Sequence, residues 1–485
     1  MNPAAAIGRS PQVAARQIWL PLAWAALAAA AYTGFSDSRI VVAIVAMAAL
    51  GLWAWFAYEH PRAAITSSFV LLLLAGTKFR LRDATDSLDG VVDAQVLLEL
   101  GLFAAIGIAG LAAWLASCSR ARTGKVDMLI GMYVVIALLS VLWSATSTLS
   151  LVRGAQLLIV ALLATAAVRV LRPSMALWAP CAAAGVYTVS CAALAATFPW
   201  ALGTVDRGDR VRFAWFAVHP LEVGTLAAIA ALGMIAALIW PPPFLRRRRA
   251  VALLCYPVAL SAAGVLVLTN SRGPLLALAA GLATAAFFRL PARLRPAVVS
   301  LVAAAIVLLV AAGPDLRGWL LRTAAHNRAV AGVLLQGQSA DEVLGLSGRV
   351  DLWSDMRPAL AAHGLFGYGY QASRPVLLTA AEWTPAYAHN AFLQSLLDTG
   401  VAGTLALIAV VAVALSSVFR RGLTPRVRGT TAALTVFLVL NAMTTEGFAG
   451  APGIEALLLF ICALCAASTR SVCAVERPYD STGRP

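Results

Sequence analysis

The best candidate for acid–base chemistry is His389, which stands with Asn390 where a polar loop gives way to an apolar run, in AYAHNAFLQSLLDTG (386–400). Histidine has an unperturbed pKa of about 6.5, which suits proton abstraction near neutrality. In the plainer alternative, Asn390 caps the helix that begins at Ala391 and His389 only marks a wet interface. Position alone leaves both interpretations of His389 open.

Several arginines could bind an anion such as phosphate, because a guanidinium group donates hydrogen bonds in a planar, bidentate geometry. Arg272, in the motif NSRG, leads directly into an apolar run, where it would add its charge to the positive end of a helix dipole. A second group is Arg207, Arg210 and Arg212, of which Arg212 lies closest to the next apolar run and is the best ligand candidate. Alternatively, Arg272 only extends its charged end to the membrane surface. The charges of Arg207, Arg210 and Arg212 could likewise only be neutralised by nearby aspartates.

Two further sites are less specific. Arg349, in SGRVDLW, lies at the start of an expected loop helix, and it could bind a phosphate or a sugar or pair with Asp351 or Asp355. His219 is a second-rank candidate that we expect inside the membrane. Glu222 follows it, and because a carboxylate is costly in hydrocarbon we expect this side chain to have a partner inside the helix bundle.

No nucleotide, metal or cofactor motif accompanies these residues. The sequence has no GxxxxGK[ST], no GxGxxG after a strand and no well-placed DxD pair. It also has no cluster of histidines and carboxylates at the spacing of metal ligands. We therefore predict no metal and no cofactor, and we expect the driving force to lie in an activated substrate such as a lipid diphosphate.

The elements that position these residues are membrane helices. Hydrophobic residues make up 61% of the 485-residue chain and charged residues 12%, which predicts an all-α polytopic membrane protein. The apolar runs are continuous, and about 12–14 of them are long enough to suggest spans. They centre near 18–33, 40–58, 64–76, 94–117, 126–143, 152–171, 177–198, 213–240, 250–268, 273–288, 296–313, 391–418, 430–446 and 453–468.

The charge pattern predicts the orientation of these helices. The chain carries 37 basic and 22 acidic residues, a formal net charge of +15, and many arginines cluster in short loops on one side if the spans alternate. The positive-inside rule makes that side the cytoplasm, so we predict cytoplasmic N- and C-termini and no nucleic-acid partner. Arg207, Arg210, Arg212 and Arg272 fall on the opposite side, against this rule, which suggests that they have another role.

We predict four parts: an N-terminal bundle (1–313), a non-cytoplasmic loop domain (314–390), C-terminal helices (391–470) and a cytoplasmic tail (471–485). At 77 residues the loop is too long for a simple connector and could roof a site. Its pattern predicts an amphipathic helix over 315–335, a second helix from Ser347 through Leu360 and then a tight, glycine-rich turn.

The motifs NSRG, SGRVDLW, HGLFGYGYQ and AHNAFLQSLLDTGVAG, in this order, resemble those of the O-antigen ligase and polymerase superfamily. The resemblance covers residues 207–403 approximately. It implies an integral glycosyltransferase of the bacterial inner membrane, with about twelve spans and a long periplasmic loop over the active site. It also implies a glycan donor on undecaprenyl diphosphate and, in the ligase branch, an acceptor sugar on the core of lipid A.

Position by position, the resemblance makes His389 the base that activates the acceptor hydroxyl, and Arg272 and Arg212 the residues that hold the diphosphate. VHPLEVG (218–224) departs from the family, many of whose members have an Asn-rich turn there. A base opposite the leaving group predicts inversion at the anomeric carbon. We expect an O-antigen ligase first and a polymerase second. A transporter for an anionic lipid is a third hypothesis, and it would require basic residues at mid-membrane depth.

Overall fold

The computed structural model describes residues 38–77, 94–117, 124–207, 210–216, 218–311, 348–380, 387–420 and 422–467. In the first half the α-helices are α2 (Ser38–Glu59), α3 (Pro61–Ala75), α4 (Ala94–Ser117), α5 (Lys125–Leu139), α6 (Ser147–Val170), α7 (Pro173–Thr197) and α8 (Pro220–Ile239). The remaining ones are α9 (Pro243–Arg247), α10 (Arg249–Leu268), α11 (Arg272–Arg289), α12 (Arg295–Ala311), α16 (Arg349–Asp355), α17 (Arg357–His363), α18 (Arg374–Ala380), α19 (Ala391–Leu415), α20 (Pro425–Ala442) and α21 (Ile454–Ala467).

Seven helices of the described part of the chain are long and apolar enough to cross a membrane. They are Gln95–Ala116, Lys125–Leu142, Ser147–Val170, Pro173–Thr197, Pro220–Ile239, Arg249–Leu268 and Ala391–Val418. The chain is therefore an all-α polytopic membrane protein, as predicted.

The apolar runs expected at 64–76 and 453–468 form shorter helices, of 15 and 14 residues. The predicted run at 18–33, the amphipathic helix over 315–335 and the tail lie outside the described residues.

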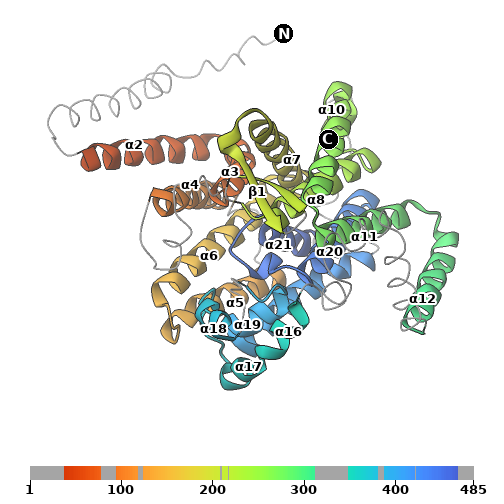
Figure 1. The fold of residues 1–485 in the computed structure, drawn as a ribbon. Coiled ribbons are helices and arrows are strands. Elements are labelled where there is room, and N and C mark those ends of the chain that lie inside the picture. Colours follow the sequence, from red (N-terminus) through yellow and green to blue (C-terminus); the bar gives the residue numbers. More distant parts are fainter. Residues whose placement is uncertain are drawn as a thin grey trace, which may run out of the picture.

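Helix α21 lies inside the bundle and organises it (Figure 1). It packs against α6, α19 and α20, while α8 packs between α7 and α10 and α11 packs along α20. Small residues allow some of these close approaches. A Cβ atom at Gly233 of α8 would lie 2.1 Å from the Cβ of Cys181 on α7, so this crossing requires a glycine.

One end of the bundle is basic. The guanidinium group of Arg428, at the start of α20, lies 5.2 Å from the ring of Phe288, near the end of α11. Ser174, Trp240 and Arg426 line one small pocket, so the start of α7, the end of α8 and the start of α20 meet here. The arginine-rich loops before α7, after α8 and before α20 thus emerge at a common end.

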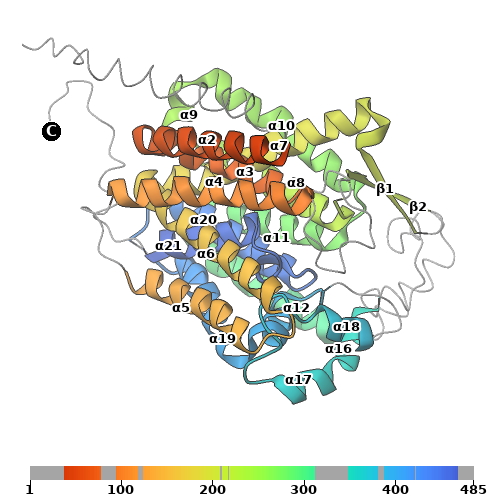
Figure 2. The ribbon, with the colours of Figure 1, turned by 90° about the vertical axis from the view of Figure 1, so that its left-hand side faces the viewer.

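The opposite end carries a feature that the sequence analysis did not predict, a β-hairpin made of β1 (Leu202–Arg207) and β2 (Arg210–Trp215). Its register pairs Val205 with Arg212 and Arg207 with Arg210. Figure 2 shows this hairpin at the right of the molecule, on the same side as α16 and α18. The hairpin and the described part of the long loop therefore lie toward one end of the bundle.

The long loop is hydrogen-bonded to α19 through a break in that helix. Gly400 interrupts α19 with φ 65° and ψ −166°, a conformation that essentially only glycine adopts. The backbone N–H groups of Tyr368 and Gly369 donate to the carbonyls of Leu397 and Asp398, at 2.7 and 2.9 Å. The glycine-rich turn predicted in the sequence thus forms and supplies donors to the carbonyls before the break.

The second loop helix differs from the prediction. We expected one helix from Ser347 through Leu360, but α16 ends at Asp355 and α17 begins at Arg357. The cause is Pro358, which occupies the first turn of α17, where its missing N–H costs nothing. A continuous helix would lack one backbone hydrogen bond at that proline.

Candidate active site

The backbone around His389 is fixed on both sides. Asn390 caps α19, and its side-chain oxygen accepts from the N–H groups of Phe392 and Leu393 at 3.0 and 3.2 Å, so the predicted capping role is confirmed. Before the histidine, the N–H of Ala388 donates to Gln394 Oε1 at 2.9 Å. His389 itself has φ 49°, a left-handed conformation that costs free energy in any residue except glycine.

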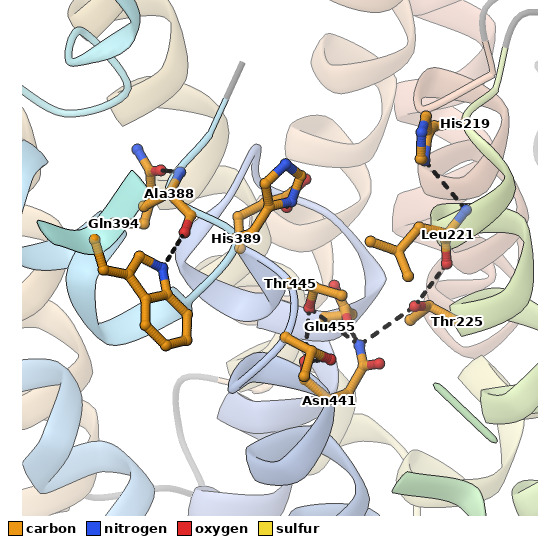
Figure 3. A network of polar contacts seen from close by, with 12 residues as sticks. His219, Leu221, Thr225, Ala388, His389, Gln394, Asn441, Thr445 and Glu455 are labelled. Carbon is orange, nitrogen blue, oxygen red and sulfur yellow. Dashed lines mark hydrogen bonds and ion pairs between the residues drawn. The ribbon is translucent and has the colours of Figure 1, made fainter. Parts of the chain in front are cut away.

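A helix of the long loop covers this backbone. The indole N–H of Trp353, on α16, donates to the carbonyl of Ala388 at 2.9 Å (Figure 3). Arg349 is the first residue of α16 and lies one turn before Trp353. Arg349 therefore belongs to the helix that contacts the backbone next to His389.

An acidic residue lies beside the histidine. His389 Nδ1 and Glu446 Oε2 are 4.0 Å apart, and the two side chains are 21% and 29% exposed. At this distance the contact is electrostatic, since a hydrogen bond would require roughly 3 Å. At 4.0 Å the carboxylate holds the ring by no hydrogen bond, but its charge stabilises the imidazolium that forms when the other nitrogen takes up a proton. The pair can therefore act as a base.

Glu446 was not among the residues predicted for the site. The residue lies in TTEGFAG, at the end of the apolar run 430–446 and on the predicted side of the long loop. This position in the sequence could have identified Glu446 as a candidate site residue. Tyr387 shares its surroundings: burial raises the pKa of Tyr387 to about 12, and the negative charge of Glu446 contributes to the rise.

Two of the predicted arginines meet at one turn. Arg212, on β2, donates from Nε to the carbonyl of Thr269 at 3.0 Å and from its terminal amino group to Ser271 Oγ at 2.9 Å. Arg272 follows as the first residue of α11, so the predicted helix start is confirmed. Ser271 Oγ also donates to the carbonyl of Pro220 at 3.3 Å, which seats the turn on the start of α8. Two guanidinium groups and a helix N-terminus thus make this turn suitable for an anion.

The turn Thr444–Glu446 joins the histidine to the arginines. At one end of it, Glu446 lies beside His389. At the other end, Thr444 touches the first turn of α11 so closely that a Cβ atom at Gly273 would lie 2.3 Å from Thr444 Oγ1. The structure therefore brings His389 and Arg272 to the same three-residue turn.

The remaining predicted residues lie around this centre. Arg207 and Arg210 face each other as backbone partners at the end of the hairpin, two residues beyond Arg212 in the register. His219 corrects the prediction of an intramembrane histidine: it is exposed and occupies the N-cap position of α8, where its Nδ1 accepts from Leu221 N at 3.2 Å. Glu222 is likewise exposed, in the first turn of α8, where the helix dipole favours a carboxylate.

The fold and the site together define a polytopic membrane protein that presents a histidine, an acid and two arginines at one end of its bundle. Residues 257–408 match the family model of the O-antigen ligases, which confirms the resemblance to that superfamily of membrane glycosyltransferases. The match covers less than half of the chain and includes Arg272, Arg349, His389 and Asn390. No curated protein matches the chain.

Proposed function

We propose that the chain is an O-antigen ligase. It transfers a glycan chain from undecaprenyl diphosphate to an acceptor sugar on lipid A-core, without a metal or other cofactor. The observation that carries this proposal is the placement of His389 and Arg272 on either side of the turn Thr444–Glu446. A base and an anion site that meet at one turn would serve the two ends of a glycosyl transfer, the attacking hydroxyl and the departing diphosphate.

In the proposed reaction the acceptor oxygen attacks the anomeric carbon while the bond from that carbon to the diphosphate oxygen breaks. The proton of the acceptor hydroxyl passes to His389, through the ring nitrogen that faces away from Glu446. The electron pair of the broken bond leaves with the diphosphate, whose charge Arg212 and Arg272 stabilise. Because base and leaving group lie on opposite faces of the sugar, the configuration inverts.

The other predicted residues receive supporting roles. Arg207, Arg210 and Arg349 would make further contacts with the donor, from the hairpin and from the roof helix α16. Asn390 sets the height of the base by capping α19, and it would also contact the substrate. Membrane lipids surround the bundle, and the lipid tail of the donor would enter from them.

We also propose that the site faces the periplasm of a bacterial inner membrane, with both termini in the cytoplasm. The support is the division of charge, because arginines gather at the end opposite the hairpin and the loop helices. The loop domain 314–390 would then roof the site between the N-terminal bundle and the C-terminal helices. Accessibility labelling of single cysteines on the hairpin and after α8 tests this orientation.

Deleting the gene and running the lipopolysaccharide on a gel tests the ligase. A ligase deletion leaves bare core and free lipid-linked polymer. The alternative, an O-antigen polymerase of the same superfamily, predicts core that bears one repeat. Both enzymes would use the same donor chemistry, so only the length of the attached glycan distinguishes them.

A transporter remains the alternative of a different class. It would move the lipid-linked glycan without forming a bond. Purified protein that joins donor to acceptor, in the absence of nucleotide and divalent ions, excludes transport as the only activity. If the purified protein forms no product while the cells still require it for surface polysaccharide, the ligase proposal is wrong.

A further inference from the structure

A buried polar network lies directly beneath the candidate site. Its centre is Asn441, which is 0% exposed near the end of α20. The side-chain amide of Asn441 donates to Glu455 at 2.7 Å and contacts the hydroxyls of Thr225 and Thr445 at 3.3 Å each. Figure 3 shows these side chains converging below His389. The network thus joins α8, α20 and α21.

The donors and acceptors of this network fix its geometry. The hydroxyl of Thr225 donates to the carbonyl of Leu221 at 3.0 Å, and that of Thr445 donates to the carbonyl of Asn441 at 3.0 Å. Both hydroxyls are therefore left as acceptors toward the Asn441 amide. Glu455 supplies the third and shortest acceptor, from the first turn of α21. The amide has two hydrogens, so one goes to Glu455 and the two hydroxyls share the other.

The network supports the turn on which the proposed mechanism depends. Thr445 lies between Thr444, which touches Gly273, and Glu446, which lies beside His389. By contrast, Arg212 is held by its own hydrogen bonds to Thr269 and Ser271. Loosening the network should therefore displace Glu446 more than Arg212.

We propose that Asn441 and Glu455 are positioning residues for the transfer reaction, which hold the turn Thr444–Glu446 so that the carboxylate of Glu446 stays beside His389. The inference rests on the proposed glycosyl transfer and extends it to residues that touch no substrate. Glu455 acts as a hydrogen-bond acceptor for Asn441. A glutamine has a side-chain oxygen at the same position and should therefore also accept the hydrogen bond from Asn441.

The test compares Asn441→Ala, Glu455→Ala and Glu455→Gln in the full-length protein reconstituted in nanodiscs. Transfer kinetics are measured with lipid-linked glycan, and affinity is measured with undecaprenyl diphosphate alone. The two alanine variants should lower kcat about tenfold to a hundredfold, since a displacement of about 1 Å in catalytic geometry has effects of this size. Glu455→Gln should restore most of the activity, and undecaprenyl diphosphate should bind all three variants with nearly unchanged affinity.

The matched control is Thr435→Val, which removes a buried hydroxyl on the same helix whose bond goes to the carbonyl of Thr431. It should leave kcat unchanged. Normal kcat in Asn441→Ala, or a Glu455→Gln variant as slow as Glu455→Ala, overturns the positioning role. Equal losses of kcat and diphosphate affinity also overturn it, because they indicate a general loss of fold. Failure of the proposed function is distinct, since then neither wild type nor any variant forms product.

Discussion

The imidazole of His389 and the carboxylate of Glu446 lie 4.0 Å apart, although the two residues belong to different segments of the bundle. Neither residue holds the other in place. His389 is fixed by the cap of α19, whereas Glu446 is fixed by the turn after α20. The distance between the two side chains therefore depends on the packing of these two helices. Variants of either residue can test it.

Removing the acid should weaken the base without abolishing transfer. We expect Glu446→Gln to lower kcat about tenfold to a thousandfold, because the imidazolium that forms during proton transfer loses its counter-charge. The measurement is the rate of glycan transfer by purified protein under saturating donor. Glu59→Gln, at an exposed acid on α2, is the control and should behave as wild type. Wild-type kcat in Glu446→Gln would show that the pair has no catalytic role.

The backbone conformation of His389 allows a clean deletion of its side chain. With φ 49°, the position accepts glycine without strain, whereas a β-branched residue is penalised there. His389→Gly should therefore fold as well as wild type and lose transfer by about a hundredfold to ten-thousandfold, the usual contribution of a general base. His389→Val should lose stability as well as activity.

Thermal unfolding in detergent measures the stability difference between these two variants. Gel analysis of lipopolysaccharide reports the loss of activity. If His389→Gly transfers glycan at the wild-type rate, the assignment of the base is wrong.

The anion site should require the fork geometry of Arg212. A lysine cannot donate to both Thr269 and Ser271 from the positions that the guanidinium group uses. We expect Arg212→Lys to weaken the binding of undecaprenyl diphosphate about tenfold, as does Arg272→Ala, and the double variant to lose less than the sum of the two effects. Isothermal titration measures the affinities, with the exposed Arg62→Lys as control. Strict additivity would argue against one shared site.

The contact between Gly273 and Thr444 predicts a steric test. A Cβ atom at Gly273 would lie 2.3 Å from Thr444 Oγ1, so Gly273→Ala should destabilise the protein by about 1–3 kcal/mol and reduce transfer. Thr444→Ala removes the nearer atom and should restore part of the stability in the double variant. Gly264→Ala is the control, since a Cβ atom there has nothing within 4 Å. The readouts are Tm and transfer rate, and an unaffected Gly273→Ala variant would contradict the close packing.

The sequence predicted what short-range patterns determine. The apolar runs predicted the helices, Asn390 was correctly expected to cap α19, and α11 begins at Arg272 as expected. The sequence patterns did not predict features that depend on contacts between residues far apart in the sequence. Glu446 gains its significance only because α20 brings it to His389. The apolar run 213–240 suggested that His219 lies inside the membrane, whereas it is the exposed N-cap of α8. The hairpin was not predicted, because the second half of β2 falls in the apolar run 213–240.

The break in α19 at Gly400 sets limits on how this protein can be recombined. The turn around Tyr368 and Gly369 supplies the donors for the carbonyls of Leu397 and Asp398, so loop and helix complete each other's backbone. A chimera that exchanges the loop with that of a relative, but keeps the native first half of α19, would separate these partners. Exchange of acceptor specificity between such proteins should therefore succeed only when the crossover point falls beyond Gly400.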